Sequence, residues 1–319
     1  VVNVSKDYTG KKAVDDISFD VSASENFVLI GTSGCGKTTT LRMINRLTEL
    51  SSGKIFIDGR DAKEGSATEL RRNIGYVLQH HGLFPHYTVE ENIAVVPLLL
   101  GWDKPRIRSR TEELMNKLHL PPDRYLKAYP SELSGGQQQR VGLARALVAD
   151  PPVILMDEPF GALDDVTRTS IRKEFSELDE FKRKTMVMVT HDVNEAFDLG
   201  DRICLMDKGK IVQQGSRFDL LFRPANDFVK DFLKGHRLEL QLRVTVMNDI
   251  LPFIDTIIDA RTDQQSDTSM NLWTAMEKLF YSREASDHLL FADPETTGKQ
   301  KMVMIPDLIN AFRKFNQQY

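Results

Sequence analysis

The residues most suited to chemistry form a short glycine-rich run, Gly-Thr-Ser-Gly-Cys-Gly-Lys-Thr at positions 31–38. The run fits the pattern G-x-x-x-x-G-K-[ST] and lies between a strand pattern at 27–30 and a helical pattern from Lys37, the context this motif requires. Its glycines let backbone N–H groups surround phosphate oxygens, while a lysine and a hydroxyl can bind the terminal phosphates and Mg²⁺. The run therefore predicts an ATP site with Mg²⁺ on Thr38, formed by Gly31, Thr32, Ser33, Gly34, Cys35, Gly36, Lys37, Thr38 and Thr39.

Two carboxylates and a histidine follow two further strand patterns. Asp157 and Glu158 come directly after the apolar run 153–156, and His191 follows the run 186–189. In isolation an Asp-Glu pair or a histidine favours a structural role. Parallel strands, however, bring these side chains to the edge of the sheet where ligands gather. We expect Asp157 to hold the water shell of Mg²⁺, Glu158 to orient and deprotonate an attacking water, and His191 to contact the γ-phosphate.

These groups must be positioned by strands and helices, and along the sequence short apolar runs, typical of buried strands, alternate with amphipathic segments, typical of helices. Helical spacing is present at 106–118 and at 137–149, between and around the strand patterns. Strands that alternate with helices predict an α/β fold with a largely parallel central sheet.

The bulk composition limits the classes of function. With 319 residues the chain is long enough for two domains, and its 41% hydrophobic and 28% charged content is that of a globular protein. The sequence contains no apolar run of the roughly 20 residues that span a bilayer. A net charge of −4 argues against a nucleic-acid partner. Two cysteines without a disulfide or zinc pattern favour a reducing cytoplasm.

Residues 133–137, Leu-Ser-Gly-Gly-Gln, resemble the signature of ABC ATPases. The resemblance covers residues 1–235 and implies a P-loop NTPase fold with a helical subdomain. In that family, two subunits pair head to tail, so that each signature binds the ATP on its partner. The resemblance further implies adenine stacking by Tyr8, a link from Mg²⁺ to the transport interface by Gln79, and a dimer-crossing loop at 162–164. The additional nucleotide-site residues that it implies are Ser134, Gly135, Gly136, Gln137 and Asp164, with Gln79 also near the metal.

Within this family the chain is most similar to the ATPases of osmoprotectant importers, which transport glycine betaine, carnitine, choline or proline. The stretches that carry this similarity are 43–47, 82–93, 100–102 and 224–229. The resemblance implies a homodimer at the cytoplasmic face of the plasma membrane, with transmembrane permease subunits and a substrate-binding protein as partners. The alternatives are an importer for another small solute and a non-transport ABC ATPase. Residues 39–133 lack the sustained heptads of chromosome-structuring relatives.

Two positions in the phosphate loop depart from the family pattern. Thr32 replaces a proline, which the loop should tolerate. Cys35 takes the place of a small residue, where a helix N-terminus could acidify its thiol and make ATP binding sensitive to oxidation. A small side chain that simply fits is the favoured interpretation.

Residues 236–319 form a second expected domain, a small α+β regulatory or dimerisation unit. Residues 272–315 read as helix, strand, strand and helix, with strands at 289–292 and 302–305 and a last helix opened by Pro306. This order resembles one CBS motif. It implies either a sensor of ionic strength or of cyclic di-AMP, or a dimerisation domain without a ligand. The side chains expected to face inward on the last helix are Leu308, Ile309, Phe312 and Phe315.

Overall fold

A computed structural model describes residues 1–79, 82–258, 265–281, 288–293 and 299–319. The chain divides into two compact units, residues 1–214 and 215–319. Residues 215–235 thus pack with the C-terminal unit, and the family-based boundary at 235 stays a prediction. Among the described residues, no helix is both long and apolar enough to cross a membrane.

A six-stranded sheet forms the centre of the first unit, in the order β11-β10-β3-β9-β8-β7. Strands β10, β3, β9, β8 and β7 run parallel to one another, which confirms the predicted α/β fold. Buried apolar side chains fill both faces, as expected for parallel strands covered by helices. The strands are β3 Asn26–Gly31, β7 Ile74–Val77, β8 Val153–Asp157, β9 Thr185–Val189, β10 Arg202–Asp207 and β11 Lys210–Ser216.

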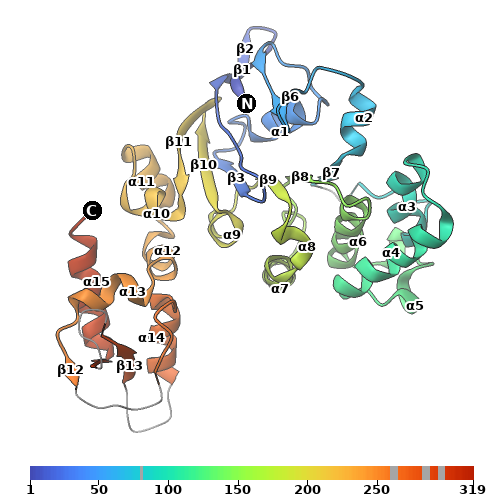
Figure 1. Cartoon of the computed structure of the whole chain (residues 1–319). Helices are drawn as coiled ribbons and strands as arrows, with labels where there is room; N and C mark the ends of the chain where they lie inside the picture. The colour runs from blue at the N-terminus through green and yellow to red at the C-terminus, as the bar shows by residue number, and fades with distance from the viewer. Residues whose placement is uncertain (80–81, 259–264, 282–287, 294–298) are drawn as a thin grey trace. The chain divides into compact units, whose positions relative to one another are not determined.

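Further strands and helices surround the central sheet of this unit (Figure 1). A three-stranded sheet has the order β2-β1-β4, and β5 pairs with β6. Helix α1 begins at Lys37, directly after the glycine-rich loop. The elements are β1 Val2–Tyr8, β2 Lys11–Ile17, α1 Lys37–Ile44, β4 Ser52–Lys54, β5 Phe56–Ile57, β6 Arg60–Asp61, α2 Ala67–Arg72, α7 Asp165–Glu177, α8 Asp179–Lys182 and α9 Val193–Leu199.

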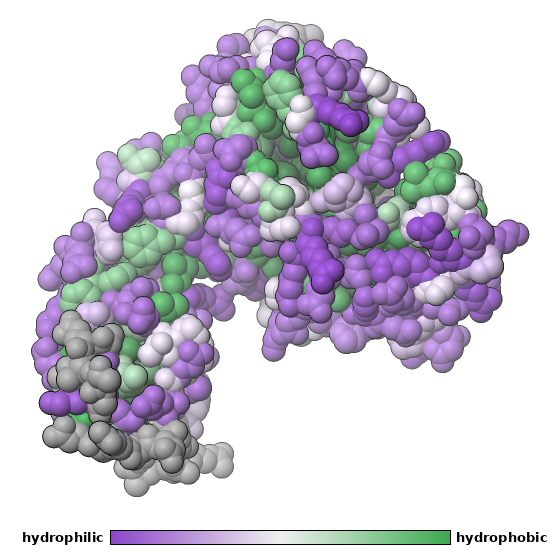
Figure 2. Space-filling view, viewed as in Figure 1, coloured by the Kyte–Doolittle hydropathy of each residue, from purple (hydrophilic) through white to green (hydrophobic). Residues whose placement is uncertain are grey.

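Four helices form a helical subdomain beyond strand β7 (Figure 1). They are α3 Val89–Leu99, α4 Lys104–Lys117, α5 Pro122–Tyr125 and α6 Gly135–Leu147. Helices α4 and α6 confirm the two sequence-predicted helices to within two residues at each end. Hydrophilic side chains cover most of the visible surface of this subdomain, with a hydrophobic patch over α3 (Figure 2). The exposed apolar side chains there are Leu98, Leu99 and Leu100.

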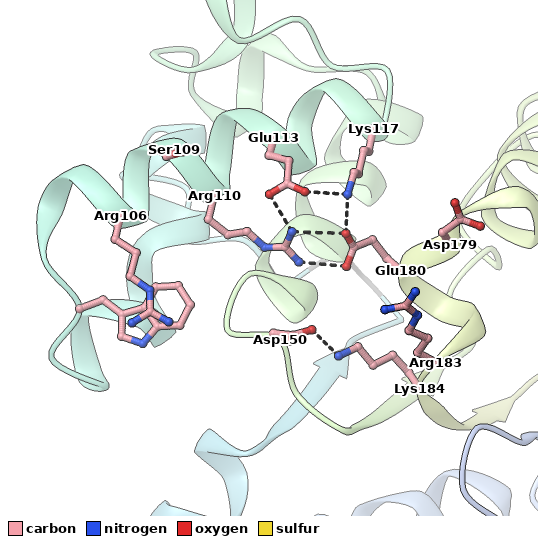
Figure 3. A pocket seen from close by; sticks show the side chains of 11 residues that line it. Arg106, Ser109, Arg110, Glu113, Lys117, Asp150, Asp179, Glu180, Arg183 and Lys184 are labelled. Atoms are coloured by element: carbon pink, nitrogen blue, oxygen red, sulfur yellow. Dashed lines mark hydrogen bonds and ion pairs between the residues drawn. The ribbon is translucent and has the colours of Figure 1, made fainter.

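A charged cavity of about 680 Å³ separates α4 of the helical subdomain from α8. Figure 3 shows Arg110 and Lys117 pointing from α4 toward Glu180 on α8. Arg110 donates to both carboxylate oxygens of Glu180, at 2.9 and 3.3 Å, and Lys117 donates to one of them at 2.6 Å. Hydrogen bonds between ionised groups are stronger than those between neutral groups. This cluster therefore links the helical subdomain to the rest of the unit.

The Glu180→Gln variant should be less stable than the parent at neutral pH by about 1–2 kcal/mol, a value that allows for screening in the open cavity. Partial burial would raise the pKa of Glu180, but hydrogen bonds from Arg110 and Lys117 outweigh it and lower this pKa to about 2. A lowered pKa stabilises the folded state above the ordinary value of 4.5, and this stabilisation fades as the pH falls toward 2. The difference between parent and variant should therefore shrink from pH 5 downward.

Urea unfolding followed through Trp102, which lines the same cavity, measures this difference in a Trp273→Phe background. Asp179→Asn is the control, because Asp179 is 89% exposed and its ion pair is with Lys182, one turn along the same helix, and not with the helical subdomain. A loss of the same size in both variants, or one that does not change with pH, would contradict the assignment.

The described part of the C-terminal unit contains three antiparallel strands, in the order β12-β14-β13, and six α-helices. The predicted order of helix, strand, strand and helix is confirmed by α14, β13, β14 and α15. Its elements are α10 Arg217–Phe222, α11 Asp227–Leu233, α12 Arg237–Val244, α13 Met247–Ile250, β12 Ile257–Ile258, α14 Leu272–Tyr281, β13 Leu289–Ala292, β14 Gln300–Val303 and α15 Ile305–Asn316. The resemblance to a CBS motif stays a prediction.

Two details of this unit differ from the prediction. Strand β14 ends at Val303 and α15 already begins at Ile305, because Asp307 accepts a hydrogen bond from the Met304 backbone and caps the helix there. Ile309 is 41% exposed, and Ala311 takes the inward position beside Leu308, Phe312 and Phe315. The sequence also predicts a polar loop at 261–271 and a turn at 293–298, and parts of both lie outside the described residues.

Candidate functional site

The carboxyl ends of the parallel strands bring the predicted phosphate loop and catalytic side chains to one edge of the sheet. Strand β3 ends at Gly31, where the loop begins, and β8 ends at Asp157. Inside the loop, the Lys37 ammonium donates to the carbonyl oxygens of Gly31 at 2.9 Å and Thr32 at 3.0 Å. The loop therefore surrounds a buried cation, as a cradle for phosphate oxygens requires.

Two glycines of the loop hold conformations that a side chain would disturb. Gly31 has φ +146°, and an added Cβ would lie 2.0 Å from the carbonyl oxygen of Met206 on β10. Gly36 has φ +105°, and its Cβ would lie 2.4 Å from the carbonyl oxygen of Ala13 on β2. Both positions need glycine because the loop packs directly against neighbouring backbone.

The side chains expected at the metal lie beside one another. The Thr38 hydroxyl donates to a carboxylate oxygen of Asp157 at 2.9 Å, and Asp157 is 2% exposed. Burial raises the pKa of Asp157, against the hydrogen bond from Thr38 and the charge of Arg42. A hydroxyl and a carboxylate at this spacing suit Mg²⁺, which takes oxygen ligands and keeps several waters and phosphate oxygens.

Glu158 is the meeting point of three segments. One carboxylate oxygen accepts from the Gln79 amide at 2.9 Å and lies 3.0 Å from Nδ1 of His191. The backbone of Glu158 has a φ of +46°, a left-handed conformation, and its N–H donates to the carbonyl of Val189 at the end of β9. The structure thus brings together the predicted base, the predicted histidine and the glutamine that was expected near the metal.

The remaining loop residues divide by exposure. Thr32, Ser33 and Gly34 are exposed, whereas Thr38 and Thr39 are half-buried. Cys35 is 2% exposed, within a buried apolar cluster that also contains Cys204, and its sulfur lies 3.7 Å from the Lys37 ammonium. This burial supports the view that Cys35 is a small side chain that fits.

One residue at this edge was not expected. Asp207, the last residue of β10, accepts a hydrogen bond from the Thr32 hydroxyl at 2.9 Å. Asp207 follows the apolar run 203–206, just as Asp157 follows the run 153–156. The sequence pattern that predicted Asp157 at this edge could therefore have predicted Asp207 as well.

Apart from Gln79, the residues assigned through the family resemblance lie elsewhere. Ser134 and Gln137 form a capping box at the start of α6, and Asp164 caps α7 by accepting from the Thr167 N–H at 3.0 Å. In the described part of the chain, no hydrogen bond or ion pair joins residues 134–137 to the phosphate loop. Tyr8 is 47% exposed at the end of β1, with the Lys6 ammonium 4.8 Å from its ring centre. Gly135 and Gly136 open the same helix as Ser134.

Gly136 allows helix α6 to pack closely against α7. Its Cβ position would lie 2.8 Å from the Thr167 side chain of α7, so a glycine lets the two helices approach. The N–H groups at the start of α6 remain the natural binding point for an anion.

Comparison with known proteins agrees with this geometry. Residues 14–161 match the family model described as ABC transporter. A glycine betaine/carnitine/choline transport ATP-binding protein of Bacillus subtilis is 54% identical over 74% of this chain, which spans 62% of that relative's length. An osmoprotectant import ATP-binding protein of Salmonella typhimurium is 47% identical over 87% of this chain and 71% of its own.

Solved structures show the same fold. An ATP-binding cassette solved as a dimer in a post-hydrolysis state, bound to ADP and Pi, matches with a TM-score of 0.61 and 34% identity. The match covers 67% of this chain and 97% of that one. The phosphate loop and the neighbouring Asp157 and Glu158 agree with what these relatives show. The chain belongs to the family of ABC transporter ATP-binding proteins.

Proposed function

We propose that this chain binds ATP with Mg²⁺ and hydrolyses it to drive an importer for osmoprotectants. The observation that carries the proposal is the position of Glu158, which contacts Gln79 and His191 and directly follows Asp157, the partner of Thr38 in the phosphate loop. In this assignment Lys37 and the loop N–H groups bind the phosphates, while Thr38, Gln79 and Asp157 hold the metal. Bound Mg²⁺ neutralises charge that develops on the phosphate oxygens. Glu158 accepts a proton from the attacking water, and His191 orients that water.

The site is completed by a second copy of the chain. Ser134 and Gln137 lie at the start of a helix, a place that favours an anion, and within the described residues no hydrogen bond or ion pair joins them to the chain's own phosphate loop. Pairing head to tail lets the residues from Ser134 to Gln137 grip ATP on the partner, with Tyr8 against the adenine and Asp164 in the loop at the interface. The similar ATP-binding cassette, a dimer bound to ADP and Pi, supports the pairing of two copies.

Membrane partners follow from the same assignment. Leu98, Leu99 and Leu100 at the end of α3 are exposed, and Figure 2 shows a hydrophobic patch over this helix, which suits the docking of a permease subunit. The chain would then work at the cytoplasmic face of the membrane, with a substrate-binding protein to deliver the solute. The solute class rests on the similarity to relatives that are transport ATP-binding proteins for glycine betaine, carnitine and choline.

Uptake of labelled solute tests the proposal. The chain is expressed together with the membrane subunits that co-purify with it, in cells that lack osmoprotectant uptake of their own. We expect accumulation of glycine betaine, carnitine, choline or proline with the parent, and none with the Glu158→Gln variant. Accumulation of none of these four solutes by an assembly that still hydrolyses ATP would refute the solute class and leave the ATPase intact.

A further inference from the structure

Arg168, in the first turn of α7, folds its guanidinium back onto the loop that follows Glu158. Its Nε donates to the carbonyl oxygen of Phe160 at 3.3 Å, and Nη2 donates to that of Leu163 at 2.8 Å. Arginine presents its donors in a rigid planar fork. One side chain can therefore fix two backbone carbonyls of a loop that belongs to neither a helix nor a strand.

The same guanidinium faces the segment that carries His191. Its Nη1 lies 3.9 Å from one carboxylate oxygen of Asp192, the next residue along the chain. The other oxygen of Asp192 caps α9 by accepting from the N–H groups of Asn194 at 2.8 Å and Glu195 at 3.3 Å. Asp192 is thus fixed to α9 on one side and to Arg168 on the other.

A second tether holds the backbone before His191. The N–H of Asp192 donates to the Thr190 hydroxyl at 3.0 Å, and that hydroxyl donates to the buried carboxylate of Glu195. His191 itself is 63% exposed, so its place is set by its neighbours in the chain and by its contact with Glu158.

We propose that Arg168 is a positioning residue for ATP hydrolysis. It holds the loop after Glu158 against the residue after His191, and so keeps these two side chains at their 3.0 Å contact. It acts through both residues and is not itself a catalytic residue. The inference rests on the proposed roles of Glu158 and His191.

The chain supplies a matched control one turn further along α7. Arg172 pairs with Asp198 at 3.0 Å, which joins the same two helices, α7 and α9. Arg172 and Arg168 have side-chain exposures of 14% and 25%. If the role of Arg168 were only to brace α7 against α9, then losing Arg172 would have the same consequence.

Steady-state hydrolysis separates the two roles. In Arg168→Met we expect kcat to fall on the order of 10–100-fold while KM for ATP stays within about threefold, because displacement of a positioned group slows the chemical step more than it weakens binding. Arg168→Lys should recover part of kcat, since an ammonium can still donate to the Leu163 carbonyl. Arg172→Met should keep kcat within about twofold of the parent value, although its melting temperature changes by about as much as that of Arg168→Met.

The ring signals of ¹⁵N-labelled histidines report on positioning without turnover. The His191 signal, identified by its loss in His191→Gln, should move in Arg168→Met and stay in place in Arg172→Met. Equal losses of kcat in the two methionine variants, a raised KM with unchanged kcat, or an unmoved His191 signal would each overturn the inference. If the parent hydrolyses no ATP, the proposed function fails, and the His191 signal still decides the role of Arg168.

Discussion

Glu158→Gln should lower the rate of ATP hydrolysis on the order of 10²–10⁴-fold and leave ATP binding intact. The amide has nearly the shape of the carboxylate and can still accept from Gln79 at its carbonyl oxygen, but it cannot take a proton from water. ATP would then persist at the site, and the dimer that it closes should accumulate. Phosphate release measures the rate, and size-exclusion chromatography with Mg²⁺ and ATP measures the dimer.

Glu177→Gln is the control for this experiment, since it removes the same charge from an exposed position near the end of α7. This variant should hydrolyse ATP at the parent rate and should not accumulate dimer. Parent-like turnover by Glu158→Gln would show that another group accepts the proton.

Lys37→Met should weaken ATP binding at least about 100-fold without lowering the melting temperature. Each lost charge-assisted bond to a phosphate removes about 1.5–3 kcal/mol, and 1.4 kcal/mol is a factor of ten in affinity. The folded protein loses little, because Lys37 is only 6% exposed and the hydrogen-bond partners of its ammonium are the carbonyls of Gly31 and Thr32 and the Cys35 sulfur. Replacing a buried charge by an apolar side chain of similar size is often neutral or stabilising.

Titration calorimetry with ATP and Mg²⁺, beside thermal unfolding without nucleotide, checks both halves of this prediction. Lys12→Met serves as the comparison, because Lys12 is an exposed lysine that pairs with Asp15. A Kd within tenfold of the parent value would exclude Lys37 as the main phosphate contact. A large drop in melting temperature would mean instead that Lys37 holds the loop together.

The central site was accessible from sequence because its signals are local. A glycine-rich run between a strand and a helix, and acids directly after apolar runs, fix both the elements and the edge where they meet. Asp157 and Glu158 could be placed in this way, and Asp207 carried the same signal.

Other features could not be predicted because they depend on contacts across the chain. Arg168 binds carbonyl oxygens, and every residue type carries a carbonyl, so no residue pattern marks its partners. On α15 the apolar spacing fits Ile309 as well as Ala311, and tertiary packing decides that the smaller side chain is buried.

The left-handed backbone of Glu158 has a consequence for how this protein can change over time. A left-handed conformation costs a residue with a side chain on the order of 1 kcal/mol, and glycine or asparagine adopts it with less strain. Selection for a more stable fold therefore favours replacing the residue that the proposed chemistry most needs. Selection for hydrolysis retains it, so at this one position the two pressures act in opposite directions.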